Sequence, residues 1–251
     1  MAVDTPLERL SRHKRFIGVI TPSGNTVVER VTISILRDFP EVSCHFSRTG
    51  VVGETDPFPA SYDWESMLGA AHLLSHAKPD MIVWNGSKAG SIAVDLDREL
   101  CNRIRAETGI PATTSTLALV DALNARGARR IAIITPYTDT YQNKVVATFK
   151  REGYDCVAEV AVGLTDNLSF AAIPFDDIRT MIRDVAKAKP DAVVAWCTNF
   201  PAAPLAAEME AETGIPLFDS AALAVWHPLV RLGYDTRQAH AWGTLFGAAG
   251  G

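Results

Sequence analysis

The sequence places one thiol where an apolar run ends. Residues 193–202 read VVAWCTNFPA, so Cys197 closes the run and Thr198 and Asn199 follow it. At a strand-to-helix turn, backbone N–H groups and the helix dipole lower the pKa of a thiol or bind a carboxylate. A cysteine can also simply fill buried space. This position instead favours a chemical role for Cys197, with Thr198 as a substrate-binding donor.

The same stretch occurs twice in the chain. Residues 78–88 read KPDMIVWNGSK and residues 189–199 read KPDAVVAWCTN, so without a gap Gly86 falls opposite Cys197 and Ser87 opposite Thr198. Glycine is common in tight turns. Here the repeat favours a binding role, in which Gly86 leaves room for substrate and Ser87 adds a hydroxyl. Lys88 comes next, either to pair with a carboxylate or to be solvated.

Two Thr-Pro loops supply further polar side chains. In PSGNT (22–26), Ser23 and Asn25 are predicted to bind substrate, and the alternative is turn formation or helix capping. In TPYTD, Tyr137 follows Pro136 directly. Its phenol is predicted to donate to a carboxylate or an enolate, and the alternative is a half-buried loop aromatic.

The remaining candidates are assigned structural roles. Asp139 and Asp166 are expected to be caps or turn residues, and His227 a packed or capping histidine. The other cysteines, Cys44, Cys101 and Cys156, are expected to be core or surface residues. The scattered cysteines predict free thiols and no disulfide framework. His72 and His76 form one HxxxH pair, but no Cys/His metal spacing accompanies it, so no metal site is predicted.

Composition excludes several classes of partner. The 251 residues are 47% hydrophobic and 21% charged, with a formal net charge of −5 and no long Lys/Arg block, so nucleic acid is not an expected partner. No apolar run approaches the roughly eighteen residues that span a bilayer, and the charged start MAVDTPLERLSRHKR does not read as a signal peptide. We therefore expect a cytoplasmic protein with no membrane partner.

Short apolar runs alternate with longer amphipathic segments, a pattern typical of an α/β fold with parallel sheets. Strands are predicted at 16–22, 42–50, 81–86, 130–136, 156–162 and 192–198, and helices at 95–109, 115–127, 204–214 and 220–233. AETGIP occurs at 106–111 and again at 211–216, so the whole chain is two copies of one unit. We predict two pseudo-symmetric lobes, 1–116 plus 222–251 and 117–221. Their facing strand ends line one cleft.

With these loops in place, the chain resembles the maleate isomerase and arylmalonate decarboxylase branch of the aspartate/glutamate racemase superfamily. The resemblance covers nearly the whole chain, from TPSGNT through TPY, GLTDN and CTN to WGTLF at 242–246. It implies two lobes around a cleft, no cofactor, and chemistry at a carbon next to a carboxylate.

The resemblance also implies a function through one departure. Racemases and isomerases of this superfamily typically carry a cysteine on each side of the cleft, whereas the arylmalonate decarboxylases have glycine at the first site, as Gly86 is here. We therefore expect a lyase that decarboxylates an aryl- or alkylmalonate through an enediolate protonated by Cys197. One carboxylate would lie among Ser87, Tyr137 and Thr198.

Two alternatives stay open. The first is a maleate isomerase or a racemase of a small carboxylic acid that works with one cysteine, which the isomerase-like PSGNT loop favours. The second is a non-catalytic protein that binds a small carboxylate. The substrate is a small carboxylate in each case, and the oligomeric state, a homo-oligomer included, is left open.

Overall fold

The computed structural model describes residue 7 and residues 14–51 and 60–247. Parts of the predicted first lobe, 1–6, 8–13, 52–59 and 248–251, lie outside the described residues. Within the described ranges, eight strands form two separate sheets. They are β1 (Arg15–Pro22), β2 (Val42–Thr49), β3 (Met81–Trp84), β4 (Ala112–Thr114), β5 (Arg130–Thr135), β6 (Asp155–Ala161), β7 (Ala192–Ala195) and β8 (Leu217–Asp219).

The two sheets have the same topology. Each holds four parallel strands, in the order β2-β1-β3-β4 in the first and β6-β5-β7-β8 in the second. The predicted α/β fold with two parallel sheets is confirmed, and so are all six predicted strands. The strands β4 and β8, of three residues each, were not predicted, because so short a run carries no readable alternation.

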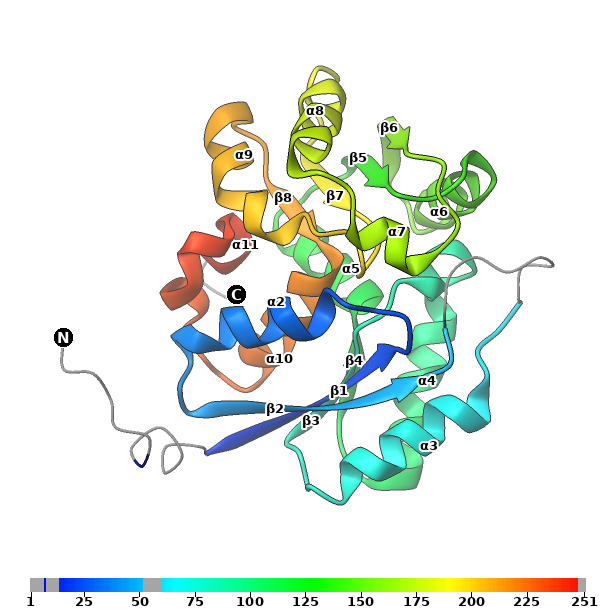
Figure 1. The fold of residues 1–251 in the computed structure, drawn as a ribbon, viewed down its shortest axis with the longest axis vertical. Coiled ribbons are helices and arrows are strands. Elements are labelled where there is room, and N and C mark those ends of the chain that lie inside the picture. The colour runs from blue at the N-terminus through cyan, green and yellow to red at the C-terminus, as the bar shows by residue number, and fades with distance from the viewer. Residues whose placement is uncertain (1–6, 8–13, 52–59, 248–251) are drawn as a thin grey trace.

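Helices flank both sheets. They are α2 (Val28–Ile35), α3 (Trp64–Ser75), α4 (Val94–Thr108), α5 (Ser115–Ala125), α6 (Asp139–Arg151), α7 (Asn167–Ala171), α8 (Phe175–Ala186), α9 (Ala206–Thr213), α10 (Ser220–Arg231) and α11 (Thr244–Gly247). In Figure 1, α3 and α4 lie on the outer side of the first sheet, and α2 and α10 lie in the middle of the molecule. Helix α10 contacts α2 and α5 and also strands of both sheets. The lobe boundary at 221/222 therefore stays a prediction.

The repeated motifs have matching structural roles. In the two KPD motifs, Lys78 and Lys189 both adopt a left-handed backbone, with φ of 48° and 51°. The aspartate of each motif then accepts from the start of the neighbouring strand: Asp80 binds the Phe16 N–H, and Asp191 binds the Arg130 N–H. This end of each sheet is opposite the strand ends that carry Gly86 and Cys197, so the KPD repeat has a structural role and lies away from the candidate site.

The AETGIP motifs end helices in the same way. Gly109 and Gly214 follow α4 and α9 with φ of 72° and 71°, a left-handed conformation that glycine adopts without steric cost. The threonine before each glycine donates from its hydroxyl to a carbonyl four residues earlier. The repeat seen in the sequence is thus a repeat of turns and caps.

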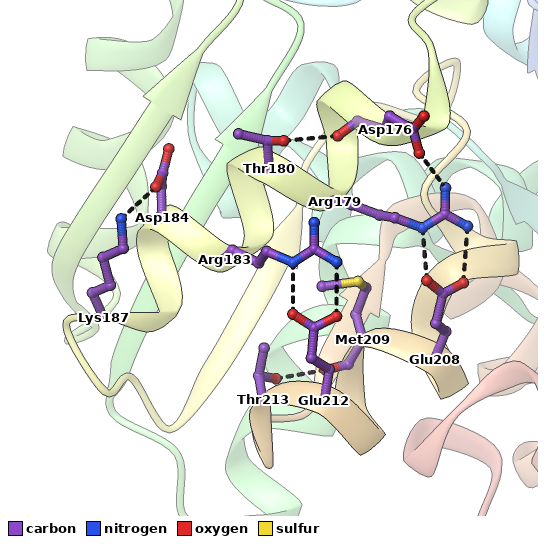
Figure 2. A network of polar contacts seen from close by, with 10 residues as sticks. All are labelled: Asp176, Arg179, Thr180, Arg183, Asp184, Lys187, Glu208, Met209, Glu212 and Thr213. Carbon is purple, nitrogen blue, oxygen red and sulfur yellow. Dashed lines mark hydrogen bonds and ion pairs between the residues drawn. The ribbon is translucent and has the colours of Figure 1, made fainter.

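Helices α8 and α9, in the second lobe, are joined by two forked ion pairs (Figure 2). Arg179 binds Glu208 with N–O distances of 2.7 and 2.9 Å, and Arg183 binds Glu212 with 2.6 and 2.9 Å. Each pair lies one helical turn from the other on both helices, so the two helices run in register along this seam. The carboxylates are largely exposed, which keeps the contribution of such pairs to stability small.

Candidate functional site

The two turns that the sequence aligned occupy equivalent places. Trp84, the last residue of β3, pairs with Ile20 and Thr114. Ala195, the last residue of β7, pairs with Ile134 and Asp219. Gly86 and Cys197 each lie two residues beyond these positions, so the gap-free alignment holds in three dimensions.

Cys197 is buried and in contact with a phenol. Its side chain is 3% exposed, and its thiol has a hydrogen bond with the hydroxyl of Tyr137. Burial raises the pKa of Cys197 to about 12, and the hydrogen bond from Tyr137 opposes this rise only in part. Of the two alternatives expected at this turn, a lowered thiol pKa is not seen, because the regular helix α9 begins only at Ala206 and desolvation outweighs the turn. Binding of a carboxylate stays a prediction.

Tyr137 joins the two lobes. Its hydroxyl lies 3.0 Å from the Ser87 hydroxyl, in a contact where either can donate. Burial raises the pKa of Tyr137 well above its usual range, and a negative charge on Cys197 would raise it further. The structure therefore brings Cys197, Tyr137 and Ser87 into one buried chain of polar groups that crosses between the lobes.

Asn25 and Thr198 form a second contact across the lobes. The Asn25 amide donates to the Thr198 hydroxyl over 3.2 Å, while its oxygen accepts from the backbone N–H groups of Val27 and Val28 at the start of α2. Asn25 is thus a helix cap that also contacts the Cys197 turn. Thr198 is 2% exposed and lies directly beside the thiol.

The structure does not bring Ser23 to this cluster. Its side chain is exposed, and it exchanges two hydrogen bonds with the backbone of Val51, at 3.2 and 3.1 Å. Lys88 is half-buried at the start of a short 3-10 turn, Lys88–Ser91. Burial lowers the pKa of Lys88, and the charge of Asp63 opposes that shift. Among the described residues, no ion pair of Lys88 is seen.

Gly86 does not leave an open space. A Cβ atom built on Gly86 would lie 2.1 Å from Cζ2 of Trp84, far inside any real contact. The indole of Trp84 thus covers the Cα of Gly86. Trp84 occupies the volume that a side chain at position 86 would take, and room for substrate beside Gly86 stays a prediction.

Two buried asparagines lie near the site, and one of them, Asn199, belongs to the turn that the sequence singled out. The Asn199 oxygen accepts from the backbone N–H groups of Thr26 and Val27, at 2.9 and 3.1 Å, and its amide donates to the Asn167 carbonyl. Asn167 donates in turn to the Val51 carbonyl over 3.3 Å. The CTN sequence after β7 was the available signal for Asn199, since a buried amide must satisfy both of its ends.

A buried carboxylate next to the thiol was also missed. Asp219 caps α10 by accepting from the backbone N–H groups of Ala221 and Ala222, both at 2.9 Å. Burial raises the pKa of Asp219 to about 7, and its negative charge in turn raises the pKa of Cys197. The following residue, Ser220, accepts from the backbone N–H of Cys197 over 3.2 Å. A lone aspartate before a helix reads only as a cap.

The predicted structural residues take structural positions. His227 bridges the Thr113 hydroxyl, at 2.7 Å, and the Asp121 carboxylate, at 2.9 Å, inside the α5–α10 packing. The four cysteines are free. Among the residues that the structure describes, no group of three or more His, Cys, Asp or Glu side chains could hold a metal ion. Within that same part of the chain, no helix is long and apolar enough to cross a membrane.

The fold and the site define a class. Two parallel α/β lobes bring a thiol, a phenol and a hydroxyl together where their strands end, an arrangement suited to acid chemistry on a small bound molecule. The chain belongs to the arylmalonate decarboxylase family, whose model matches residues 85–246.

Curated relatives come from both activities in this branch. The maleate isomerase of Geobacillus stearothermophilus is 26% identical, covering 95% of this chain and 99% of its own. That of Nocardia farcinica is 27% identical, covering 82% of this chain and 86% of its own. The arylmalonate decarboxylase of Bordetella bronchiseptica is 23% identical, covering 92% and 95%. Maleate isomerases are the more numerous among the relatives found.

Solved structures agree on the fold. A variant of the maleate isomerase Iso from Pseudomonas putida S16, crystallised with maleate, superposes with a TM-score of 0.85 at 25% identity, covering 94% of this chain and 98% of its own. A cysteine-to-serine variant of the Nocardia farcinica isomerase carries a covalently bound succinylcysteine intermediate, and it superposes with a TM-score of 0.83 at 24% identity, covering 92% and 98%. The predicted resemblance is confirmed.

Proposed function

We propose that this chain is a cofactor-independent enzyme that generates an enediolate from a small carboxylate and protonates it with Cys197. Decarboxylation of an aryl- or alkylmalonate fits the site best. The observation that carries this proposal is the asymmetry of the two turns: a buried thiol at position 197, and at position 86 a glycine covered by an indole. One proton carrier suffices for a decarboxylation that ends in a single protonation.

The proposed decarboxylation needs only the side chains of the site and water. The bond from the central carbon to one carboxylate breaks, CO2 leaves, and the electron pair stays behind as an enediolate. Tyr137, Ser87 and Thr198 offer hydroxyl donors to its two oxygens. Cys197 then gives its S–H proton to the carbon, and the thiolate takes a proton from water before the next turnover.

The protonation state of Cys197 supports the role of donor. With its pKa raised to about 12, Cys197 is a thiol at neutral pH. A nucleophilic cysteine must be a thiolate, and a bound dicarboxylate would make that anion still less stable. A high pKa also makes the thiolate a strong base, so reprotonation after turnover is fast.

Maleate cis–trans isomerisation is the second candidate, and overall similarity to the relatives favours it. The Cys197 sulfur would add to one olefinic carbon, the resulting C–C single bond would rotate, and the sulfur would leave with the double bond restored. The Nocardia farcinica variant with its succinylcysteine adduct shows that such an adduct forms on a relative. Here Cys197 would first have to lose its proton.

The deciding experiment is incubation in heavy water with a panel of aryl- and alkylmalonates, maleate and amino acids, followed by NMR and CO2 release. The proposal expects CO2 release from a malonate and one deuterium at the new C–H, on a single face. Conversion of maleate to fumarate without CO2 would replace it with the second candidate. Binding of carboxylates with no turnover, unchanged in Cys197→Ala, would identify a binding protein instead.

A further inference from the structure

Two equivalent positions carry side chains of opposite size in the two lobes: the last strand residue, and the residue two places after it. In the second lobe, the small Ala195 ends β7 and the side chain at 197 is a cysteine. In the first lobe, the large Trp84 ends β3 and the residue at 86 has no side chain. In the first lobe these two positions compete for one volume, because a Cβ atom at position 86 would lie inside the indole of Trp84.

The indole of Trp84 is held in its place by a buried polar chain. Its Nε1–H donates to the Tyr62 hydroxyl over 3.0 Å, and that hydroxyl donates to Asp97 over 2.5 Å. Asp97 is fully buried in the first turn of α4, and the rings of Tyr62 and Trp84 meet edge to face at 6.0 Å. Rotating the indole away would leave its buried N–H without an acceptor, which is costly.

We propose that Trp84 determines the stereospecificity of this enzyme, because its indole, fixed by Tyr62 and Asp97, keeps any proton carrier out of the first-lobe turn. This inference rests on the proposed function for its catalytic consequence. The claim that the Trp84 indole excludes a side chain at position 86 does not depend on any turnover. Gly86 is then a consequence of Trp84, and a thiol can stand at position 86 only when position 84 holds a small residue, as Ala195 does opposite Cys197.

The test compares Gly86→Cys alone with Trp84→Ala/Gly86→Cys and Trp84→Leu/Gly86→Cys, since either replacement removes all the indole atoms that would clash. Iodoacetate, itself a small carboxylate, is the probe, and peptide mass spectrometry reads the carboxymethylation at position 86. The matched control is Gly69→Cys, where an added Cβ meets nothing within 4 Å. Near-UV circular dichroism checks that each variant is folded.

We expect the thiol introduced at position 86 to react roughly tenfold or more faster in at least one folded double variant than in Gly86→Cys alone, because reactivity follows access and thiolate character. Equal rates in the single and double variants would overturn the proposal. If both Trp84 replacements unfold, Tyr62→Phe/Gly86→Cys serves as the double variant, since it removes the acceptor that holds the indole.

Catalysis then separates the two proposals. On a malonate substrate that wild type converts, a reactive double variant should give product deuterated on both faces, while Gly86→Cys alone should keep one face. If the carboxymethylation rates are as expected but wild type decarboxylates no malonate, the proposed function is refuted. The inference that Trp84 blocks position 86 then still stands. Two-faced deuteration by Gly86→Cys alone would refute the role of Trp84.

Discussion

The turn after β3 and the turn after β7 share a backbone pattern but differ in what surrounds it. At the first, Trp84 folds outward over Gly86 into a buried cluster with Tyr62 and Asp97. At the second, the tryptophan has moved one residue along, to Trp196, and its indole lies against Gly90 of the first lobe. The first turn thus packs within its own lobe, whereas the second, which carries Cys197, packs against the other lobe.

The largest difference between the two turns should be catalytic. We expect Cys197→Ala to lower kcat by about 10²–10⁴, the usual contribution of a positioned general acid, while carboxylate binding persists through Tyr137 and Ser87. Steady-state kinetics and calorimetry on the same samples measure the two effects. Cys156→Ala is the matched control, because Cys156 lies half-buried on β6 away from the cluster. If Cys197→Ala keeps its activity, the turns after β3 and β7 do not differ in catalytic role.

Each lobe also buries one aspartate, and the two should affect stability in successive pH ranges. Burial raises the pKa of Asp97 to about 6 and that of Asp219 to about 7. Because the folded pKa lies above the unfolded value, each acid stabilises the fold at low pH, and this contribution is lost as the pH rises through the folded pKa. The loss is of order 3 kcal/mol for Asp97.

Asp97→Asn should therefore flatten the fall in unfolding free energy between pH 4 and about 6, and Asp219→Asn should flatten it up to about 7. Urea unfolding at several pH values measures both. Asp191 serves as a control of opposite sign, since backbone N–H groups of Arg130 and Arg129 lower its pKa and its stabilisation is lost as the pH falls. Parallel curves for wild type and Asp97→Asn would show that Asp97 is solvated.

The contact between Trp196 and Gly90 should be sensitive to a single methyl group. A Cβ on Gly90 would lie 2.4 Å from Nε1 of Trp196, so Gly90→Ala should destabilise the fold by about 1–3 kcal/mol, as overpacking does. Gly69→Ala, inside α3 with nothing within 4 Å, should instead stabilise it by about 1 kcal/mol. Thermal unfolding of both variants checks the contrast. Equal shifts would mean that the lobes do not meet at Gly90.

The sequence was enough for the duplication, the two sheets and most of the cluster. Its gap-free repeat located Gly86 and Cys197, and the Thr-Pro loop located Tyr137. It did not reveal Tyr62 or Asp97, because their meeting with Trp84 depends on the packing of three segments distant in the chain. It also left open whether the turn lowers the pKa of Cys197 or binds a carboxylate, since burial is a property of the folded core and the turn pattern alone suggests only the dipole.

The smallest expected difference between the lobes is in the coupling energy between side chains of their outer helix pairs. In the first lobe, the guanidinium of Arg103 on α4 lies 4.2 Å from the ring of Trp64 on α3. In the second, Arg183 and Glu212 join α8 to α9 as a forked but exposed pair (Figure 2). A double-mutant cycle of Arg183→Gln and Glu212→Gln should give a coupling of at most about 0.5 kcal/mol that decreases at high salt, because water and side-chain entropy offset the attraction. The same cycle on Arg103→Gln and Trp64→Leu should give the larger coupling, since the ring excludes water from one face of the guanidinium. A larger coupling for Arg183 and Glu212 than for Arg103 and Trp64 would mean that the exposed ion pair is rigid. The second lobe, which carries Cys197, would then be stabilised at its surface as strongly as the first lobe is stabilised by its buried cluster.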